Sequence, residues 1–247
     1  MKLFKVFIIG SIVLLVAVVG GWFVRMVGSS LPAEAAVEPY LQSTEKVTVV
    51  EDEWIRFQPA GQMPAVGFIF YPGANVDHLA YAPPLHEIAA QEFVVVGLSA
   101  PLDLAVLSPN QAREVIEAYP DIDTWVIGGH SLGGAMAARF IDTHPGAASG
   151  LVLWAAYPAD SNSLADTDLP VLSIYGTMDG VSPPRRIERR FDLLPEDTRY
   201  LVLEGANHAQ FGYYGPQNRD QTALISREEQ QAQIIAATVD FLKSFEP

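Results

Sequence analysis

The sequence contains no cysteine. This absence excludes disulfide bonds, thiol nucleophiles and thiolate metal ligands. Positive charge is also scarce, because the 247 residues include 15 Lys and Arg against 29 Asp and Glu, for a net charge of −14. Binding to a nucleic acid backbone, or docking on an anionic lipid surface through a basic patch, requires clustered cations. The composition therefore argues against both kinds of partner.

The remaining composition is that of a folded protein. Apolar residues make up 49% of the chain and charged residues 18%, which excludes a disordered or low-complexity chain. The length allows one or two domains and favours one. The sequence shows no internal repeat.

Residues 1–27 are predicted to form a membrane anchor. The run from Val6 to Val24 has no charged residue and spans 24 − 6 + 1 = 19 residues. As a helix it would be roughly 28 Å long, close to the hydrocarbon thickness of about 30 Å. Lys2 and Lys5 precede the run and Arg25 closes it, so we expect a cytoplasmic N-terminus and a body on the extracytoplasmic side.

A cleaved signal peptide is the alternative, and the body would then be secreted. Ala33-Glu34-Ala35 offers the small-x-small pattern of a cleavage site. Residues 28–44, with Gly28, Pro32 and Pro39, are predicted to form a linker. The body follows from residue 45 to residue 247. No acidic residue occurs among the first 25 residues and three cations do, so the exported part carries 12 − 29 = −17.

Strand and helix patterns alternate along the body. Apolar or alternating runs predict strands at residues 46–50, 54–58, 66–71, 93–98, 124–127, 151–156, 171–175 and 199–203. Helical spacing predicts helices at residues 78–91, 111–119, 132–144, 184–194 and 227–245. We expect an α/β fold in which an antiparallel edge hairpin precedes a mostly parallel sheet with helices on both faces. Ligands bind such sheets at the carboxyl ends of the strands.

A serine follows the third of the buried strands. It lies in Gly129-His130-Ser131-Leu132-Gly133, between a predicted strand and an alanine-rich predicted helix. A serine on such a turn has strained backbone angles, and small residues two positions away relieve the crowding. The pattern alone is also found in ordinary tight turns, but its place between strand and helix favours a nucleophile. We expect Ser131 to be that nucleophile.

A serine hydroxyl needs a base, and the base needs an acid to orient it. His208 follows the last strand in a small turn-forming loop, and Asp179 lies between Gly176 and Gly180 after the preceding strand. These two residues are the predicted base and acid. The alternatives are predicted to have packing, capping or solvent-facing roles: His78, His86, His130, His144, Asp160, Asp166 and Asp168.

The loop after the first buried strand is the predicted source of a second oxyanion donor. Gly73 allows a close approach of the backbone there. We expect the backbone amides of Ala74 and Leu132 to form the oxyanion hole, and Asn75 to face a substrate. An ordinary Pro-Gly turn is the alternative for this loop.

These motifs resemble the α/β-hydrolase superfamily from residue 45 to the C-terminus. Tyr71-Pro72-Gly73-Ala74 with Tyr81-Ala82-Pro83 is similar to a compact bacterial group of dienelactone-hydrolase-like and chlorophyllase-like proteins. The resemblance implies an eight-stranded sheet and a serine acyl-enzyme route without a metal or organic cofactor. Larger relatives carry a helical cap after the sixth strand. Here only 169 − 157 + 1 = 13 residues separate the strands, so we expect no cap domain and an open cleft.

Aromatic residues after His208 are predicted to form a wall of that cleft, at Phe211, Tyr213 and Tyr214. The alternative is that they only pack their own loop. The leading hypothesis for function is hydrolysis of a carboxylic ester or related small acyl substrate. Two alternatives stay open: acyl transfer or perhydrolysis by the same three side chains, and a non-catalytic binding protein tethered to the membrane.

Overall fold

The protein is described by a computed structural model in which residues 30–61 and 63–246 are placed. They form an eight-stranded sheet in the order β1-β2-β4-β3-β5-β6-β7-β8. The strands are β1 (Val47–Glu51), β2 (Ile55–Pro59), β3 (Val66–Tyr71), β4 (Val94–Gly97), β5 (Thr124–His130), β6 (Gly150–Trp154), β7 (Val171–Gly176) and β8 (Arg199–Leu203). The pairs β1–β2 and β2–β4 are antiparallel, and every other neighbouring pair is parallel. The predicted mostly parallel sheet with an antiparallel edge is confirmed.

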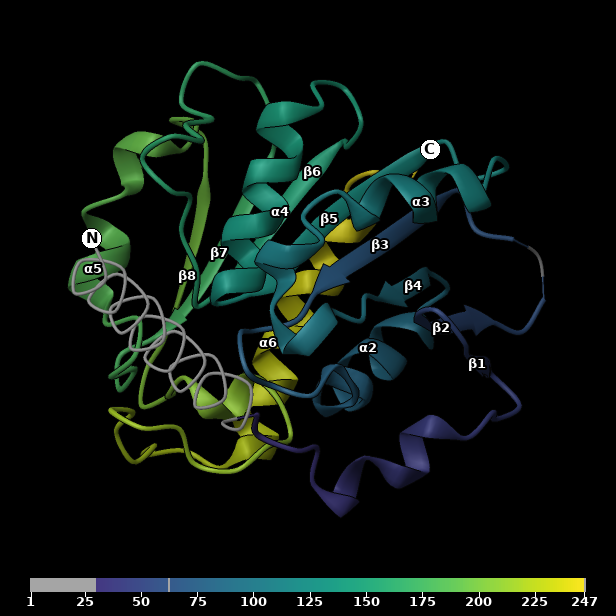
Figure 1. Cartoon of the computed structure of the whole chain (residues 1–247), viewed down its shortest axis with the longest axis horizontal. Helices are drawn as coiled ribbons and strands as arrows, with labels where there is room; N and C mark the ends of the chain where they lie inside the picture. Colours follow the sequence, from purple (N-terminus) through teal and green to yellow (C-terminus); the bar gives the residue numbers. More distant parts are fainter. Residues whose placement is uncertain (1–29, 62, 247) are drawn as a thin grey trace, which may run out of the picture.

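Helices cover both faces of the sheet, and each face has its own hydrophobic core (Figure 1). One core lies under α2 (Ala82–Ala89) and α6 (Arg227–Lys243), and the other under α3 (Gln111–Ala118) and α4 (Leu132–Thr143). Strand β3 shows why the run from Val66 to Tyr71 is continuously apolar. Phe68 and Phe70 enter the first core, while Ile69 and Tyr71 enter the second, because successive side chains of a strand point to opposite faces.

Strand β5 is longer than the sequence predicts. The sequence predicts that the strand ends at residue 127, because the two glycines that follow favour a turn. In the structure the strand continues through Gly128, Gly129 and His130. Neighbouring strands hold these residues in the sheet, because Gly129 pairs with Tyr71 of β3 and His130 with Trp154 of β6. These three additional strand residues place Ser131 at the carboxyl edge of the sheet.

Two predicted helices are broken. Residues 78–91 form a 3-10 turn, η2 (His78–Tyr81), followed by α2, because Pro83 and Pro84 lack the amide hydrogens that a continuous helix needs. Residues 184–194 form α5 (Pro184–Glu188) and η5 (Phe191–Leu193). The remaining short turns are η3 (Pro101–Asp103), η4 (Ala105–Leu107) and η6 (Ala209–Phe211). No helix or strand interrupts the connection between β6 and β7, and this agrees with the expected lack of a cap.

The segment before β1 differs from the predicted linker. It contains η1 (Ala35–Leu41), whose Val37 is buried. Leu31 donates its amide hydrogen to the carbonyl of Asn75, and Arg227 of α6 forms an ion pair with Glu34. Residues 30–41 are therefore packed against the body. Their prolines limit regular structure but do not prevent docking.

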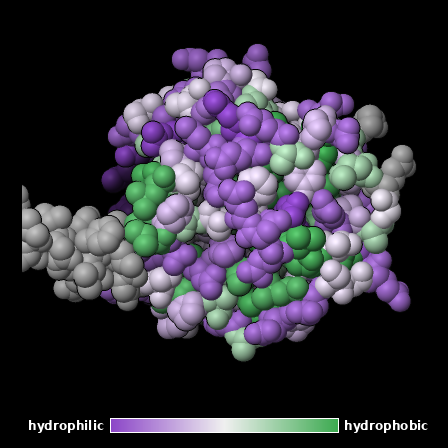
Figure 2. Space-filling model, turned by 45° about the vertical axis from the view of Figure 1, so that its right-hand side comes forward, coloured by the Kyte–Doolittle hydropathy of each residue, from purple (hydrophilic) through white to green (hydrophobic). Residues whose placement is uncertain are grey.

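The predicted anchor, residues 1–27, lies outside the described residues. Within residues 30–61 and 63–246, no helix is long and apolar enough to cross a bilayer. The anchor and the extracytoplasmic location stay predictions of the sequence. The face of the body shown in Figure 2 is largely hydrophilic, with separate apolar patches.

Candidate active site

Ser131 stands on the turn between β5 and α4, at the carboxyl edge of the sheet. Its backbone angles are φ 53° and ψ −122°, a region that side-chain-bearing residues rarely occupy. Its amide hydrogen bonds to the carbonyl of Trp154 at the end of β6, at 2.9 Å. The turn is thus held in a strained form that lifts the serine out of the sheet.

Glycines make this turn possible, because there is no room beside it. A Cβ atom on Gly129 would lie 2.5 Å from the carbonyl carbon of Gly133. A Cβ atom on Gly133 would lie 2.2 Å from the carbonyl oxygen of Tyr71. Both contacts are to backbone atoms, which cannot move aside cheaply. The two glycines that the sequence singles out are therefore required by close packing of α4 on β5 and β3.

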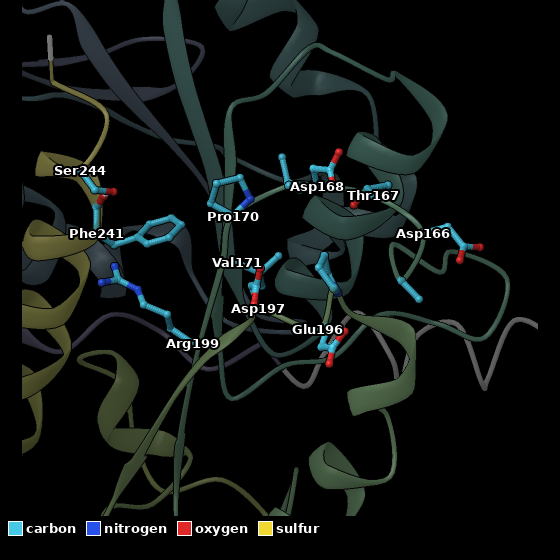
Figure 3. Close-up of a pocket in the computed structure, with 13 residues that line it drawn as sticks. Asp166, Thr167, Asp168, Pro170, Val171, Glu196, Asp197, Arg199, Phe241 and Ser244 are labelled. Carbon is cyan, nitrogen blue, oxygen red and sulfur yellow. The ribbon is translucent and has the colours of Figure 1, made fainter.

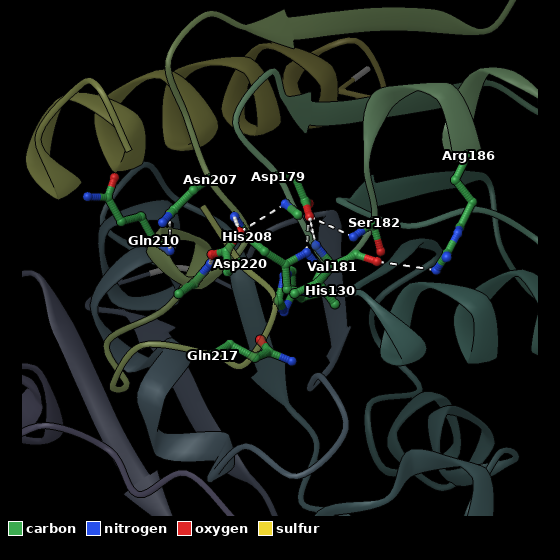
Figure 4. Close-up of polar contacts among 12 residues, drawn as sticks. His130, Asp179, Val181, Ser182, Arg186, Asn207, His208, Gln210, Gln217 and Asp220 are labelled. Carbon is green, nitrogen blue, oxygen red and sulfur yellow. Dashed lines mark hydrogen bonds and ion pairs between the residues drawn. The ribbon is translucent and has the colours of Figure 1, made fainter. Parts of the chain in front are cut away.

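His208 and Asp179 form a fully buried pair. Nδ1 of His208 lies 2.7 Å from Oδ2 of Asp179, and both side chains have 0% exposure. A carboxylate only accepts, so Nδ1 carries the hydrogen and Nε2 is left to take a proton. The other carboxylate oxygen of Asp179 accepts hydrogen bonds from the amides of Val181 and Ser182, at 2.8 and 2.6 Å (Figure 4). Three hydrogen bonds, to both carboxylate oxygens, thus fix the position of Asp179.

Asp220 holds the acid loop and the histidine loop together. Its carboxylate accepts hydrogen bonds from the amides of Gly180, His208 and Ala209, at 3.1, 3.2 and 2.8 Å. It also accepts one from the amide of Gln221, at 3.0 Å. The sequence did not single out Asp220, since its loop is polar and irregular and no motif marks contacts to backbone amides.

A buried glutamine supports the histidine loop from the opposite side. Gln230 of α6 is fully buried, and its side chain accepts from the amide of Asn207 and donates to the carbonyl of the same residue. This pairing satisfies both backbone groups of the residue before His208. A polar residue on the apolar side of the last helix is the only sequence signal for it.

His130 lies beside the pair of Asp179 and His208 and does not line the pocket that contains Ser131. It is fully buried, and its ring centroid is 4.4 Å from that of His208. Its Nδ1 is 2.8 Å from the hydroxyl of Tyr81, which also accepts a hydrogen bond from the amide of Gly73 at 3.1 Å. Burial, and then the proximity of His208, hold the pKa of His130 well below its usual value. His130 is therefore neutral, and its Nδ1 shares a hydrogen bond with the hydroxyl of Tyr81.

The two amides predicted to form the oxyanion hole have no acceptor among the described residues. Neither the amide of Ala74 nor that of Leu132 donates a hydrogen bond there, whereas the neighbouring amides of Gly73 and Asn75 do. Asn75 has a positive φ of 55°. Its side-chain oxygen is buried without a partner in the described part of the chain.

The aromatic residues after His208 do not line the pocket that contains Ser131. Phe211 is fully buried and stacks on His130, with ring centroids 5.3 Å apart. Tyr214 is also fully buried. Tyr213 lies under the guanidinium of Arg227, 4.9 Å from its ring centroid, next to residues 30–41. Aromatic patterning alone does not distinguish a core ring from a cleft ring.

The pocket next to Ser131 is small and mainly apolar. It has a volume of about 290 Å³ and is lined by Ser131, Leu132, Ala135, Ala155, Ala156, Tyr157, Ala159, Val181, Ser182 and Arg186. Val181 and Ser182 are the residues whose amides hold Asp179, so the acid loop also forms a wall of this pocket. Ser131 and the loop that holds Asp179 therefore line the same pocket, and Nε2 of His208 has no hydrogen-bond partner among the described residues.

A larger hollow of about 510 Å³ lies at the other edge of the sheet (Figure 3). It is lined by Val171 and Arg199, the first residues of β7 and β8. In parallel sheets the chemistry gathers at the carboxyl ends of the strands, so this hollow is not the reactive site. The described residues hold no group of three His, Asp or Glu side chains that could bind a metal ion.

A family model for the alpha/beta hydrolase family matches residues 67–232. The chain belongs to this family. The match covers the serine turn, the acid loop and the histidine loop of this alpha/beta hydrolase. The predicted superfamily is thereby confirmed. No curated protein sequence matches the chain.

Solved structures share the fold at low sequence identity. A predicted CIB-like hydrolase from Thermoplasma acidophilum is 16% identical with a TM-score of 0.62, covering 81% of this chain and 100% of that chain. A monoacylglycerol lipase from Paleococcus ferrophilus is 16% identical with a TM-score of 0.57, covering 79% and 99%. An esterase domain from Rhodothermus marinus is 12% identical with a TM-score of 0.58, covering 79% and 96%.

Proposed function

We propose that this alpha/beta hydrolase cleaves a carboxylic ester, or a related acyl compound, through an acyl-enzyme on Ser131. The observation that carries the proposal is the fully buried hydrogen bond between His208 and Asp179, next to a serine held at φ 53°. A buried imidazole with one nitrogen fixed by a carboxylate and the other free is the arrangement that a general base requires.

The reaction would run in two halves. Ser131 Oγ attacks the carbonyl carbon while its proton passes to Nε2 of His208, and the protonated imidazole is stabilised by Asp179. The amides of Ala74 and Leu132 are the donors we propose for the oxyanion. His208 then gives its proton to the departing alcohol. A water molecule, deprotonated by His208, attacks the acyl group and releases the acid, which restores Ser131.

Two further observations favour an ester as substrate. The family is one of hydrolases, and structures with the same fold include an esterase domain and a monoacylglycerol lipase. No step requires a metal or an organic cofactor, because base, acid and oxyanion donors are all supplied by the chain. The pocket beside Ser131 would receive part of the substrate.

A fluorophosphonate probe tests the nucleophile on the full chain. Wild type should be labelled on Ser131, and Ser131→Ala should not be labelled. Ser182→Ala, which removes the other serine hydroxyl of the pocket, should still be labelled, because only the backbone amide of Ser182 holds Asp179. Hydrolysis of a short p-nitrophenyl ester should fall roughly 10,000-fold or more in Ser131→Ala. Labelling of Ser131→Ala on another residue would refute the assignment.

A further inference from the structure

The pocket beside Ser131 has a single charged lining residue, and it is a cation. Apart from Arg186, the lining consists of apolar side chains and the hydroxyl groups of Ser131, Tyr157 and Ser182. This is unusual in a chain in which acidic residues outnumber basic ones by 29 to 15. The charge of this lining residue is therefore opposite in sign to the net charge of the whole protein.

Arg186 has no carboxylate partner among the described residues. It extends from α5 and its Nη1 donates a hydrogen bond to the carbonyl of Val181, at 3.2 Å (Figure 4). The acidic residue nearest in sequence to the lining is Asp160, and Arg190 pairs with it at 2.6 Å. The guanidinium of Arg186 therefore keeps most of its donors for a ligand.

Three further arginines lie close to Arg186 in the sequence, and none of them lines the pocket. Four arginines occur within six residues, at positions 185, 186, 189 and 190, out of the 15 − 3 = 12 cations that follow residue 25. Only Arg190 of these forms an ion pair with a described carboxylate. The stretch also contains Glu188, so the proposal depends on the position of Arg186 in the pocket lining and not on the cluster as a whole.

We propose that the pocket takes a short ester substrate that carries a carboxylate, and that Arg186 binds this carboxylate while Ser131 attacks the ester carbonyl. The inference rests on the proposed function, since it names the substrate class of the same site. An apolar pocket without a cation would disfavour an anion, because the charge would lose its hydration without a partner. Arg186 supplies that partner, with a planar fork of donors that suits a carboxylate. The volume of about 290 Å³ limits the substrate to a small one.

Two pairs of matched esters test the proposal on the full chain. Monomethyl succinate and methyl 4-methylpentanoate differ in that an isopropyl group replaces the carboxylate on the acyl side. 4-Acetoxybutanoate and 4-methylpentyl acetate carry the same exchange on the alcohol side. Hydrolysis is followed by titration of the released acid, and kcat/KM is compared within each pair.

The charged ester should be preferred in one of the two pairs, by about five- to tenfold at low salt, as expected for a charge-assisted contact at an exposed arginine. The preference should shrink at high ionic strength. Arg186→Gln should bring the ratio to one or below, and Arg186→Lys should restore part of it. Arg185→Gln, which removes an equal charge outside the pocket lining, should keep the wild-type ratio.

The possible failures are distinguishable. Equal kcat/KM values within both pairs, unchanged by Arg186→Gln, would overturn the substrate class and leave the serine hydrolase intact. An equal loss of the preference in Arg185→Gln and Arg186→Gln would also overturn the role of Arg186. Absence of turnover of all four esters, together with absence of fluorophosphonate labelling, would overturn the proposed function and the substrate class with it.

Discussion

The imidazole of His130 lies against the imidazole of His208, with centroids 4.4 Å apart and planes at 46°. Only His208 has a carboxylate partner. A proton on His130 would be a buried charge without a counter-ion, beside the proposed base, and burial followed by the nearness of His208 lowers its pKa well below 6.5. A neutral His130 therefore adds no positive charge beside the base that we propose.

His130 should therefore lower stability in mild acid. The unfolded chain binds a proton at this histidine below about pH 6.5, and the folded chain does not. The contribution of neutral His130 to the free energy of unfolding is fully present above that pH. It is lost as the pH falls toward the lower pKa that His130 has in the folded state. We expect the free energy of unfolding in urea to fall less between pH 7 and pH 5 in His130→Phe than in wild type, by up to about 2 kcal/mol. An unchanged slope in the variant would contradict this.

Because the turn at Ser131 is strained, a substitution that relieves the strain should stabilise the fold while it removes the activity. Ser131→Gly should raise the free energy of unfolding by about 1 kcal/mol, because glycine accepts positive φ and the relief of strain outweighs its larger backbone entropy. Ser131→Ala keeps the Cβ atom and the strain, so it should gain nothing. Both variants should lack esterase activity. Chemical denaturation of the three proteins measures the difference, and equal stabilities of the Gly and Ala variants would refute it.

The sequence predicts the sheet well, because each strand is marked by residues that are close to it in the chain. Each of β3 and β8 is bounded by turn-forming residues, and the structure places both at the predicted residues. Ser131 directly follows β5, and Asp179 and His208 lie in the loops after β7 and β8. These parallel strands end at one edge of the sheet. Chain order and strand ends therefore predict the same edge for all three residues, and their joint role in catalysis stays a proposal.

Long-range contacts decide what the sequence could not predict. Phe211 is predicted to be a cleft residue but stacks on His130, which lies 211 − 130 = 81 residues earlier. Residues 30–41 look like a linker, yet Glu34 meets Arg227 across 193 residues. Asp220 matters through bonds to backbone amides, and these depend on how two loops fold rather than on residue type.

Removal of the Asp220 carboxylate should misplace the proposed base. In Asp220→Ala, the amides of Gly180, His208 and Ala209 lose their acceptor, and we expect stability to fall by about 2–3 kcal/mol. kcat should fall more than KM rises, because Asp220 lines no part of the Ser131 pocket. Asp220→Asn keeps one acceptor oxygen and should recover part of both losses. Steady-state kinetics with a denaturation curve would separate the two effects, and wild-type kcat in Asp220→Ala would exclude the positioning role.

The contact of α4 with β3 leaves no room for a methyl group at Gly133. A Cβ atom there would lie 2.2 Å from the carbonyl oxygen of Tyr71 and 2.4 Å from that of Pro72. Gly133→Ala should therefore destabilise the fold by about 3 kcal/mol or more, as overpacking against rigid backbone does. Gly215→Ala is the matched control, since a Cβ atom at Gly215 meets nothing within 4 Å. An equal change in melting temperature in both variants would show that the close approach of α4 to β3 is not what constrains Gly133.

Glu34 and Arg227 attach residues 30–41 to the start of α6. The guanidinium donates to both carboxylate oxygens of Glu34, and this bond, the largest cause, lowers the pKa of Glu34. Arg227 is the first residue of α6, where the helix dipole disfavours a cation. Its ion pair and its contact with the ring of Tyr213 offset that cost.

We therefore expect a coupling of about 1 kcal/mol between Glu34→Gln and Arg227→Gln in a double-mutant cycle, since both side chains are partly exposed. Arg227→Gln should also speed proteolytic cutting between residues 30 and 44, because the docked segment would open more often. Arg199→Gln removes an exposed arginine that pairs with Asp240 at 3.3 Å, and cutting there should stay at the wild-type rate. Zero coupling, with equal cutting of both arginine variants, would mean that the other contacts of residues 30–41 hold the segment without this pair.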